Sequence, residues 1–176
     1  MTIVAKPLNA DEFAPYGDVL APPAGFGRVY FDQGLRSSRP GAWPSLSVAH
    51  ATFLPGLPLQ AKVMERHEFS SQSFVPLDVS RWLVIVAPSG ADSGPDPSRA
   101  VAFLAGPGQG VTYHAGTWHH PLTILDRPGR LPSSCGATEP RRTRSSAPSP
   151  RRSRSRCAAD AHTTGGNPWR EPMTAT

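Results

Sequence analysis

The chain has 176 residues, with 18 Lys and Arg, 13 Asp and Glu, 21 Pro and two Cys. This length is typical of a single domain that can bury a sizeable core. The longest apolar run, residues 82–87, is far shorter than the roughly 18 residues that cross a bilayer. The N-terminus also lacks the basic and long apolar regions of a secretory signal. The sequence therefore predicts a cytoplasmic protein with no membrane partner.

The formal net charge of +5 lies entirely in the C-terminal quarter of the chain. Residues 1–130 hold ten Lys and Arg and ten Asp and Glu, so they are neutral. Residues 131–176 hold eight Arg and three acidic residues, which give the whole +5, and both cysteines. The excess of basic residues therefore belongs to residues 131–176 (the tail) and not to residues 1–130 (the body). A neutral body argues against a nucleic-acid partner.

Residues 1–130 consist of short apolar segments separated by turns. A strand is expected at 3–5, and then a single helical turn at 9–13, with Asn9 as its cap and Glu12 at capping-box spacing. An alternating strand follows at 45–53. Further strands are expected at 61–67, 73–77, 82–87, 100–104, 112–114 and 122–126. Strands at roughly ten-residue spacing with hardly any helix predict one antiparallel all-β domain, a barrel or a sandwich.

Residues 131–176 form an Arg-, Ser- and Pro-rich tail. From residue 132 onward it contains no Ile, Val, Leu, Phe or Tyr. Such a segment cannot bury enough apolar surface to offset its ordering entropy, so a disordered tail is predicted. Its arginine–serine runs leave open an RNA-binding arm, whose binding would be salt-sensitive and lost on deletion of the tail.

Two segments of the body hold most of its reactive side chains. The first contains Glu65 and His67, and the second contains His114, His119 and His120. Side chains alternate along a strand, so Glu65 and His67 should face the same way, whereas His119 and His120 should face opposite ways. Imidazoles that meet carboxylate or carboxamide groups inside a β-barrel suit a divalent metal or general acid–base chemistry near pH 7.

Both segments resemble signatures of the ureidoglycolate lyase family. Residues 65–77, from Glu65-Arg66-His67 to the Phe-Val-Pro-Leu ending, are similar to the first signature, and residues 110–122, with Trp118-His119-His120-Pro121-Leu122, are similar to the second. The resemblance covers residues 3 to about 130. It implies a cupin-like double-stranded antiparallel β-barrel (a jelly roll) that forms a homodimer.

The resemblance also implies the reaction. A carbon–nitrogen lyase of the amidine-lyase class would release glyoxylate and urea from ureidoglycolate, a small-molecule substrate, in allantoin (purine) degradation. Nickel or another divalent metal is the implied cofactor, with no organic cofactor. The alternative is a non-catalytic cupin that binds or senses a small carboxylate metabolite.

Roles can be assigned on the same basis. His119 or Glu65 is expected to be the base and His67 an acid or a ligand, so these three are the predicted catalytic residues. The predicted metal ligands are His67, Gln72 and His119, a set without a carboxylate. The predicted substrate-binding residues are Ser71, Gln72, Tyr113, His114 and Trp118.

The family pattern breaks near residue 130, where the family continues with an apolar strand and an acidic segment. Codons for residues 131–139 can be chosen so that reading one nucleotide earlier gives Phe-Ala-Val-Val-Met-Trp-Arg-Asp-Gly, which is such a strand followed by a turn. We therefore predict two parts: a C-terminally incomplete lyase domain at 1–130 and a frameshift product at 131–176. The barrel would then lack a strand and expose an open edge.

Overall fold

The computed structural model describes residues 1–137 and 173–176, and almost every element in them is a β-strand. In chain order the elements are β1 (Thr2–Ile3), β2 (Lys6–Pro7), α1 (Ala10–Phe13), β3 (Gly17–Leu20), β4 (Trp43–Ala51), β5 (Phe53–Leu54), β6 (Leu59–Ala61), β7 (Gln72–Phe74), β8 (Trp82–Ala87), the 3-10 helix η1 (Pro97–Arg99), β9 (Val101–Ala105), β10 (Gly110–Tyr113), β11 (Trp118–His119), β12 (Thr123–Leu125), β13 (Gly129–Ala137) and β14 (Met173–Ala175).

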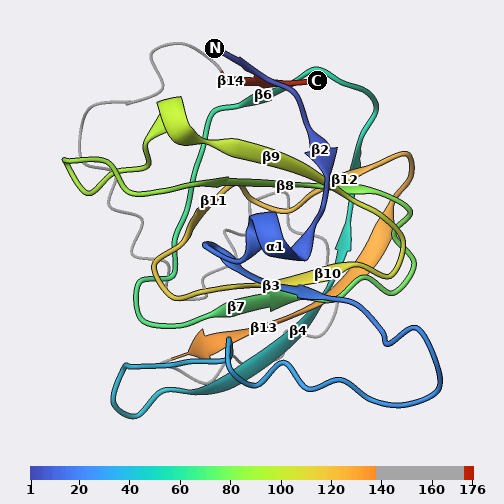
Figure 1. The fold of residues 1–176 in the computed structure, drawn as a ribbon, viewed down its shortest axis with the longest axis vertical. Coiled ribbons are helices and arrows are strands. Elements are labelled where there is room, and N and C mark those ends of the chain that lie inside the picture. The colour runs from blue at the N-terminus through green and yellow to red at the C-terminus, as the bar shows by residue number, and fades with distance from the viewer. Residues whose placement is uncertain (138–172) are drawn as a thin grey trace, which may run out of the picture.

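Two sheets face each other, and a small third sheet lies on the outside of one of them (Figure 1). The strand order is β3-β10-β7-β13-β4 in one sheet and β2-β9-β8-β12-β5 in the other, where β11 also pairs with β8. The third sheet is β1-β14-β6. Most pairs are antiparallel, and only the short pairs β1–β14, β2–β9 and β5–β12 are parallel within the described residues. The predicted all-β, cupin-like fold class is confirmed.

Strand β8 shows how the sequence builds this core. Alternate residues of a strand point to opposite faces, so Trp82, Val84 and Val86 join the cluster between the two large sheets. The intervening Leu83, Ile85 and Ala87 join a second cluster, which the small outer sheet helps to cover. Both faces of β8 are therefore buried, and this explains its unbroken apolar run.

The predicted helical turn is present as α1. The Asn9 side chain accepts hydrogen bonds from the backbone N–H groups of Asp11 and Glu12, as an N-cap does. Phe13 at its end is completely buried and packs edge-on against Phe103 of the opposite sheet. Through Phe13, this short helix fixes the N-terminal segment to the core between the two large sheets.

The disorder predicted from residue 131 is wrong for residues 131–137. They belong to β13, which pairs with β4 along its whole length and with β7 on its other side. Ladder hydrogen bonds come from backbone groups, so a strand can form without large side chains. Leu131, Ser133, Cys135 and Ala137 alternate as its buried residues. The expected missing strand and open edge at this position are therefore not found.

The rest of the predicted tail is described only at its end. Residues 173–175 form β14, which pairs with β1 and β6, so they too depart from the predicted disorder. Residues 138–172 lie outside the described residues, and the prediction for them stays untested. In the described part of the chain, no helix is long and apolar enough to cross a membrane.

Candidate active site

Glu65, His67 and His119 meet at one end of the space between the two large sheets. Each offers one oxygen or nitrogen atom, and these atoms lie within 4.8 Å of one another. A two-residue backbone bridge brings the segments together: the Glu65 N–H donates to the His119 carbonyl at 2.8 Å, and the His119 N–H donates to the Glu65 carbonyl at 2.9 Å. The three predicted catalytic residues therefore form one cluster.

The proton on His119 can be placed from its contacts. Its Nδ1 lies 2.8 Å from the Thr117 carbonyl oxygen, which can only accept, so the N–H is on Nδ1. The Nε2 lone pair then faces two acceptors, the Gln72 side-chain oxygen Oε1 at 3.0 Å and a Glu65 carboxylate oxygen at 3.7 Å. This lone pair requires a donor, which is either the amide nitrogen of Gln72 or a cation.

Burial keeps both imidazoles of the cluster neutral at pH 7. It lowers the pKa of His119 to about 3, against the opposing effect of the hydrogen bond to Thr117. It also lowers the pKa of His67, which a contact with Gln72 partly offsets. Burial raises the pKa of Glu65, so this carboxylate is a stronger base than an exposed one. The site thus combines two neutral imidazoles with one activated carboxylate.

Tyr113 fixes the plane of His119. Its ring stacks on the imidazole with the two centroids 4.1 Å apart and the planes 9° from parallel. His67 lies on the same imidazole at 5.7 Å, also stacked. Burial, with a smaller effect from Glu65, raises the pKa of the Tyr113 hydroxyl, so it remains a neutral phenol. The predicted substrate-binding Tyr113 is therefore a direct neighbour of the cluster.

Gln72 and Ser71 have different surroundings although they are adjacent. Gln72, the first residue of β7, is buried and contacts the cluster. The Ser71 hydroxyl accepts from the Arg36 N–H at 2.9 Å and donates to the Arg36 carbonyl at 3.3 Å. Ser71 thereby ties a distant loop to the segment that carries the site.

Two of the predicted substrate-binding residues lie away from the cluster. Trp118 alternates with His119 along β11, so its side chain packs on the outer apolar cluster, beneath the Arg66 guanidinium at 4.7 Å. His114 lines a separate surface cleft with Tyr16 and Arg99. His120 also points away from His119, as alternation predicts, and its Nδ1 lies near the Thr123 hydroxyl at 3.2 Å.

The chain was compared with known proteins. A family model described as Ureidoglycolate lyase matches residues 1–133. The chain belongs to the ureidoglycolate lyase family. The putative ureidoglycolate lyase of Agrobacterium fabrum is 41% identical over 130 residues, which are 74% of this chain and 80% of that protein. The ureidoglycolate lyases of Pseudomonas syringae pv. tomato and Pseudomonas aeruginosa are 33% and 35% identical over 136 residues, with 72% of this chain and 78% of each relative covered.

This family member has side chains that fit a divalent metal. Nε2 of His67 is buried and has no hydrogen-bond partner among the described residues. Together with His119 Nε2 and a Glu65 oxygen, it provides two imidazoles and a carboxylate, which suit a first-row divalent ion. His119 donates its other N–H to a backbone carbonyl, as metal-binding histidines usually do. Glu65 supplies the carboxylate that the predicted ligand set lacked.

Sequence reasoning missed the residues that line the cavity beside His67. Arg39 and Phe69 contribute side chains to it, and Ser37 and Ser70 complete its wall. Arg39 lies 28 positions before His67 in the sequence, so no local periodicity connects them. The one local signal is the Arg39-Pro40-Gly41-Ala42 run, which is typical of a tight turn.

Proposed function

We propose that the chain is a ureidoglycolate lyase that releases glyoxylate and urea in the degradation of allantoin. The observation that carries this proposal is the cluster of the half-buried Glu65 with the buried His67 and His119 in a member of this family. The reaction breaks the bond between the carbinol carbon and a urea nitrogen. The hydroxyl oxygen loses its proton and becomes the aldehyde oxygen of glyoxylate, while the departing nitrogen gains a proton.

The surroundings of each side chain favour particular roles. Glu65 is the better base, because burial raises its pKa whereas the pKa of His119 is far below neutrality. We assign the removal of the hydroxyl proton to Glu65. His67, with its unpartnered ring nitrogen, is placed to pass the proton that Glu65 takes from the hydroxyl on to the departing nitrogen, and it is neutral again at the end of the step. The Gln72 amide provides hydrogen bonds that orient the urea group.

The same donors could hold a metal. Glu65, His67, His119 and the Gln72 amide oxygen would bind nickel or another divalent ion, which would supply a Lewis acid for the substrate oxygens. In that arrangement Tyr113 keeps His119 oriented, and the Thr117 carbonyl keeps its Nε2 lone pair free. The proposal needs no organic cofactor.

The decisive experiment measures glyoxylate release from ureidoglycolate by the full chain, before and after treatment with a chelator. Glyoxylate formed in proportion to enzyme supports the lyase. Loss of the activity with the chelator and its return with nickel support the metal role, whereas unchanged activity assigns Glu65 to proton removal alone. Binding of a small carboxylate without glyoxylate release would favour the alternative, a non-catalytic sensor.

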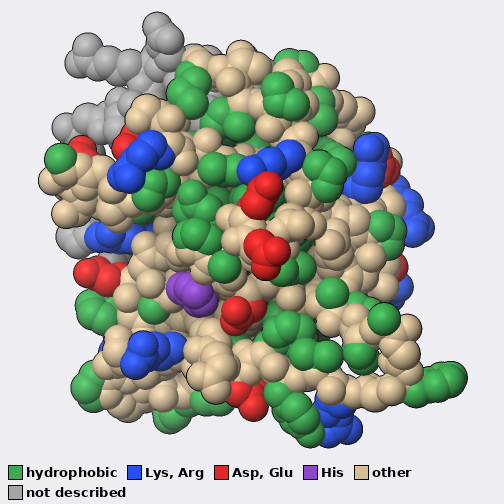
Figure 2. Space-filling view, in the orientation of Figure 1, with side chains coloured by type: hydrophobic (Ala, Val, Ile, Leu, Met, Phe, Trp, Pro, Cys, Tyr) green, Lys and Arg blue, Asp and Glu red, His purple; other side chains and the backbone are tan. Residues whose placement is uncertain are grey.

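We further propose that the protein acts as a homodimer, as the family resemblance implies, and that it is cytoplasmic and has no nucleic-acid partner. On the face drawn in Figure 2, basic and acidic side chains are interspersed, which does not favour a polyanion. Light scattering at several protein concentrations tests the dimer. A single mass equal to one chain would contradict it.

A further inference from the structure

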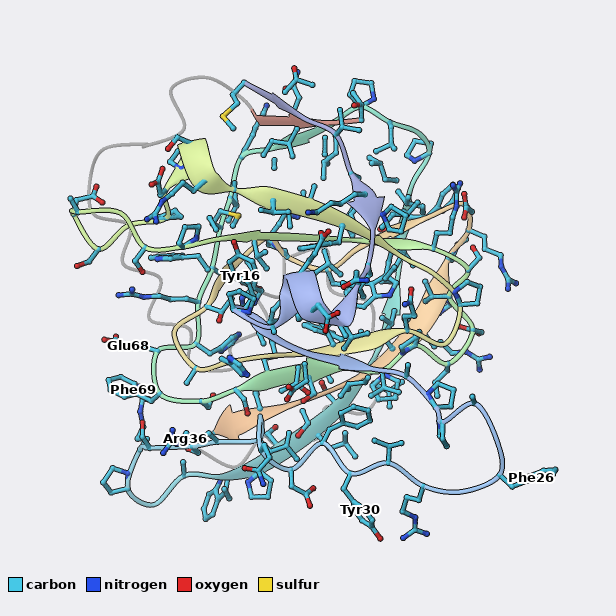
Figure 3. All side chains as sticks on the ribbon, viewed as in Figure 1. Tyr16, Phe26, Tyr30, Arg36, Glu68 and Phe69 are labelled. Carbon is cyan, nitrogen blue, oxygen red and sulfur yellow. The ribbon has the colours of Figure 1, made fainter. Side chains whose placement is uncertain are left out.

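A loop from early in the chain covers the segment that leads into the site. The Ser38 N–H donates to the Phe69 carbonyl at 2.8 Å, and the Ser71 N–H donates to the Arg36 carbonyl at 2.8 Å. Ser37 and Ser70 form a bridge between these bonds. Figure 3 shows Arg36 and Phe69 on the same side of the molecule, where these two segments meet. The loop is therefore fixed to the chain immediately before Gln72.

A tight turn sets the direction of Arg39 within this loop. The Ala42 N–H donates to the Arg39 carbonyl at 3.2 Å, with Pro40 and Gly41 between them. Gly41 has a φ of 73°. Proline followed by a residue of positive φ is the pattern of a type II turn. The Arg39 guanidinium then lies over the Phe69 ring, with its carbon 4.5 Å from the ring centroid.

Arg39 and His67 line the same narrow cavity. Phe69 forms the wall beneath the guanidinium, and Ser70 adds a polar surface. Of the described residues that line this cavity, Arg39 alone carries a positive charge. Arg66, although next to His67 in sequence, lies over Trp118 and donates to the Ser93 carbonyl. The lining of this cavity thus includes one cationic side chain and the residue His67, whose buried Nε2 has no hydrogen-bond partner among the described residues.

We propose that Arg39 binds the carboxylate of the substrate and makes the site selective for small 2-hydroxy carboxylates and their 2-oxo acid products. This proposal rests on the proposed lyase function. A guanidinium matches a carboxylate through two parallel N–H···O bonds, and stacking on an aromatic ring orients its plane. Because the carboxylate is unchanged in the reaction, Arg39 contributes to binding in the ground state and the transition state alike.

The test compares the kinetics of Arg39→Gln, Arg39→Lys and the unmodified chain. Loss of a charge-assisted bond predicts a KM for ureidoglycolate that is about 10- to 100-fold higher in Arg39→Gln, with kcat changed only slightly. Arg39→Lys keeps the positive charge but not the planar pair of N–H donors, so its KM should lie between those of Arg39→Gln and the unmodified chain. Arg36→Gln is the matched control, because this exposed arginine is in the same loop but contributes only its backbone to the contacts with Ser71.

Calorimetric titration with glyoxylate and with urea separates this proposal from the proposed function. The unmodified chain should bind glyoxylate, and Arg39→Gln should lose most of that affinity, whereas any binding of the neutral urea should be equal in the two. A chain that binds glyoxylate through Arg39 but releases none from ureidoglycolate would overturn the lyase and support the carboxylate site. An unaltered KM and glyoxylate affinity in Arg39→Gln would overturn the carboxylate site, as would an unmodified chain that binds no glyoxylate.

Discussion

At the scale of single residues, the adjacent histidines His119 and His120 allow the effect of an alanine substitution to be compared inside and outside the cluster. Both are histidines of the same motif, but His119 is buried in the cluster whereas His120 lies near Thr123, away from it. We expect His119→Ala to lower the rate of glyoxylate release by about 100-fold or more, in the range of a lost acid–base group or ligand. His120→Ala should retain nearly full activity. Similar losses in both variants, at equal melting temperatures, would contradict the assigned cluster.

The pH dependence of the rate should report Glu65. Burial raises the pKa of Glu65 above its ordinary value of 4.5 and lowers those of both cluster histidines. As the pH falls, Glu65 is therefore protonated at a higher pH than an ordinary carboxylate, and the base or ligand is lost. We predict that kcat/KM falls on the acid side through an apparent pKa above 4.5. If Glu65→Gln keeps some activity, its kcat/KM should not show this fall at acid pH. The same fall in the variant would mean that a group other than Glu65 causes it.

Much of this site could be predicted from alternation alone. The pattern correctly places Glu65 with His67 and separates His119 from His120, whereas Trp118, which was predicted to bind substrate, packs on the outer cluster. It could not show that Glu65 and His119 meet, because their bridge joins positions 54 residues apart and depends on the packing of the sheets. For the same reason the sequence did not predict that Arg39 lies near the site, since only backbone hydrogen bonds to Phe69 and Ser71 bring its loop to the cavity.

At the scale of elements, the turn at Gly41 is a separable part of the proposed carboxylate site. A Cβ at Gly41 would meet no atom within 4 Å, so an alanine there is strained only by the φ of 73°. We expect Gly41→Ala to cost about 1–2 kcal/mol of stability and to raise the KM by displacing Arg39. Gly25→Ala is the control, since its Cβ also meets nothing and its φ is not positive. Thermal unfolding and KM measurements check both variants. If Gly41→Ala and Gly25→Ala have the same melting temperature and the same KM, the turn has no role in placing Arg39.

Sequence patterns predicted some elements better than others. The continuous apolar run of β8 and the Asn9 cap of α1 depend on nearby residues, and both were predicted closely. The strand expected at 61–67 is reduced to β6 and the single bridge at Glu65, because Lys62 and Val63 find no ladder partner among the described strands. Strand β13 was missed because its pairing with β4 and β7 is carried by the backbone and leaves little trace in side-chain type.

At the scale of the whole molecule, β13 connects the structure to the proposed change of reading frame. The family match ends at residue 133, within this strand. In the alternative reading, phenylalanine, valine and methionine would occupy positions 131, 133 and 135, which are three of the buried positions of β13, and arginine would occupy the buried position 137. At positions 131, 133 and 135 the register of the strand therefore directs the restored apolar side chains toward the core. At position 133 the present occupant is a buried serine, which is smaller and more polar than valine.

The outer face of the same strand pair also suits the restored sequence. Leu46 and Val48 of β4 are 75% and 62% exposed, although both are large and apolar. They lie opposite Ser134 and Pro132 of β13. The alternative reading places valine and alanine at those two positions, so the exposed residues would gain apolar cross-strand neighbours. This face would then be a continuous apolar surface of the kind that covers itself by pairing with a second copy.

We therefore propose that restoring the frame from residue 131 stabilises the molecule. Burial of each larger side chain contributes about 1–3 kcal/mol, and for a chain of this size each 1 kcal/mol corresponds to about 2–4 °C in melting temperature. A comparison of the two chains by thermal unfolding should give a higher Tm for the restored one. Light scattering should give a greater fraction of dimer for the same chain, because its outer face is more apolar. An equal or lower Tm would show that the present residues 131–137 pack in this strand as well as the restored ones. If resequencing finds the same reading frame across this point, no frameshift has occurred and the proposal fails.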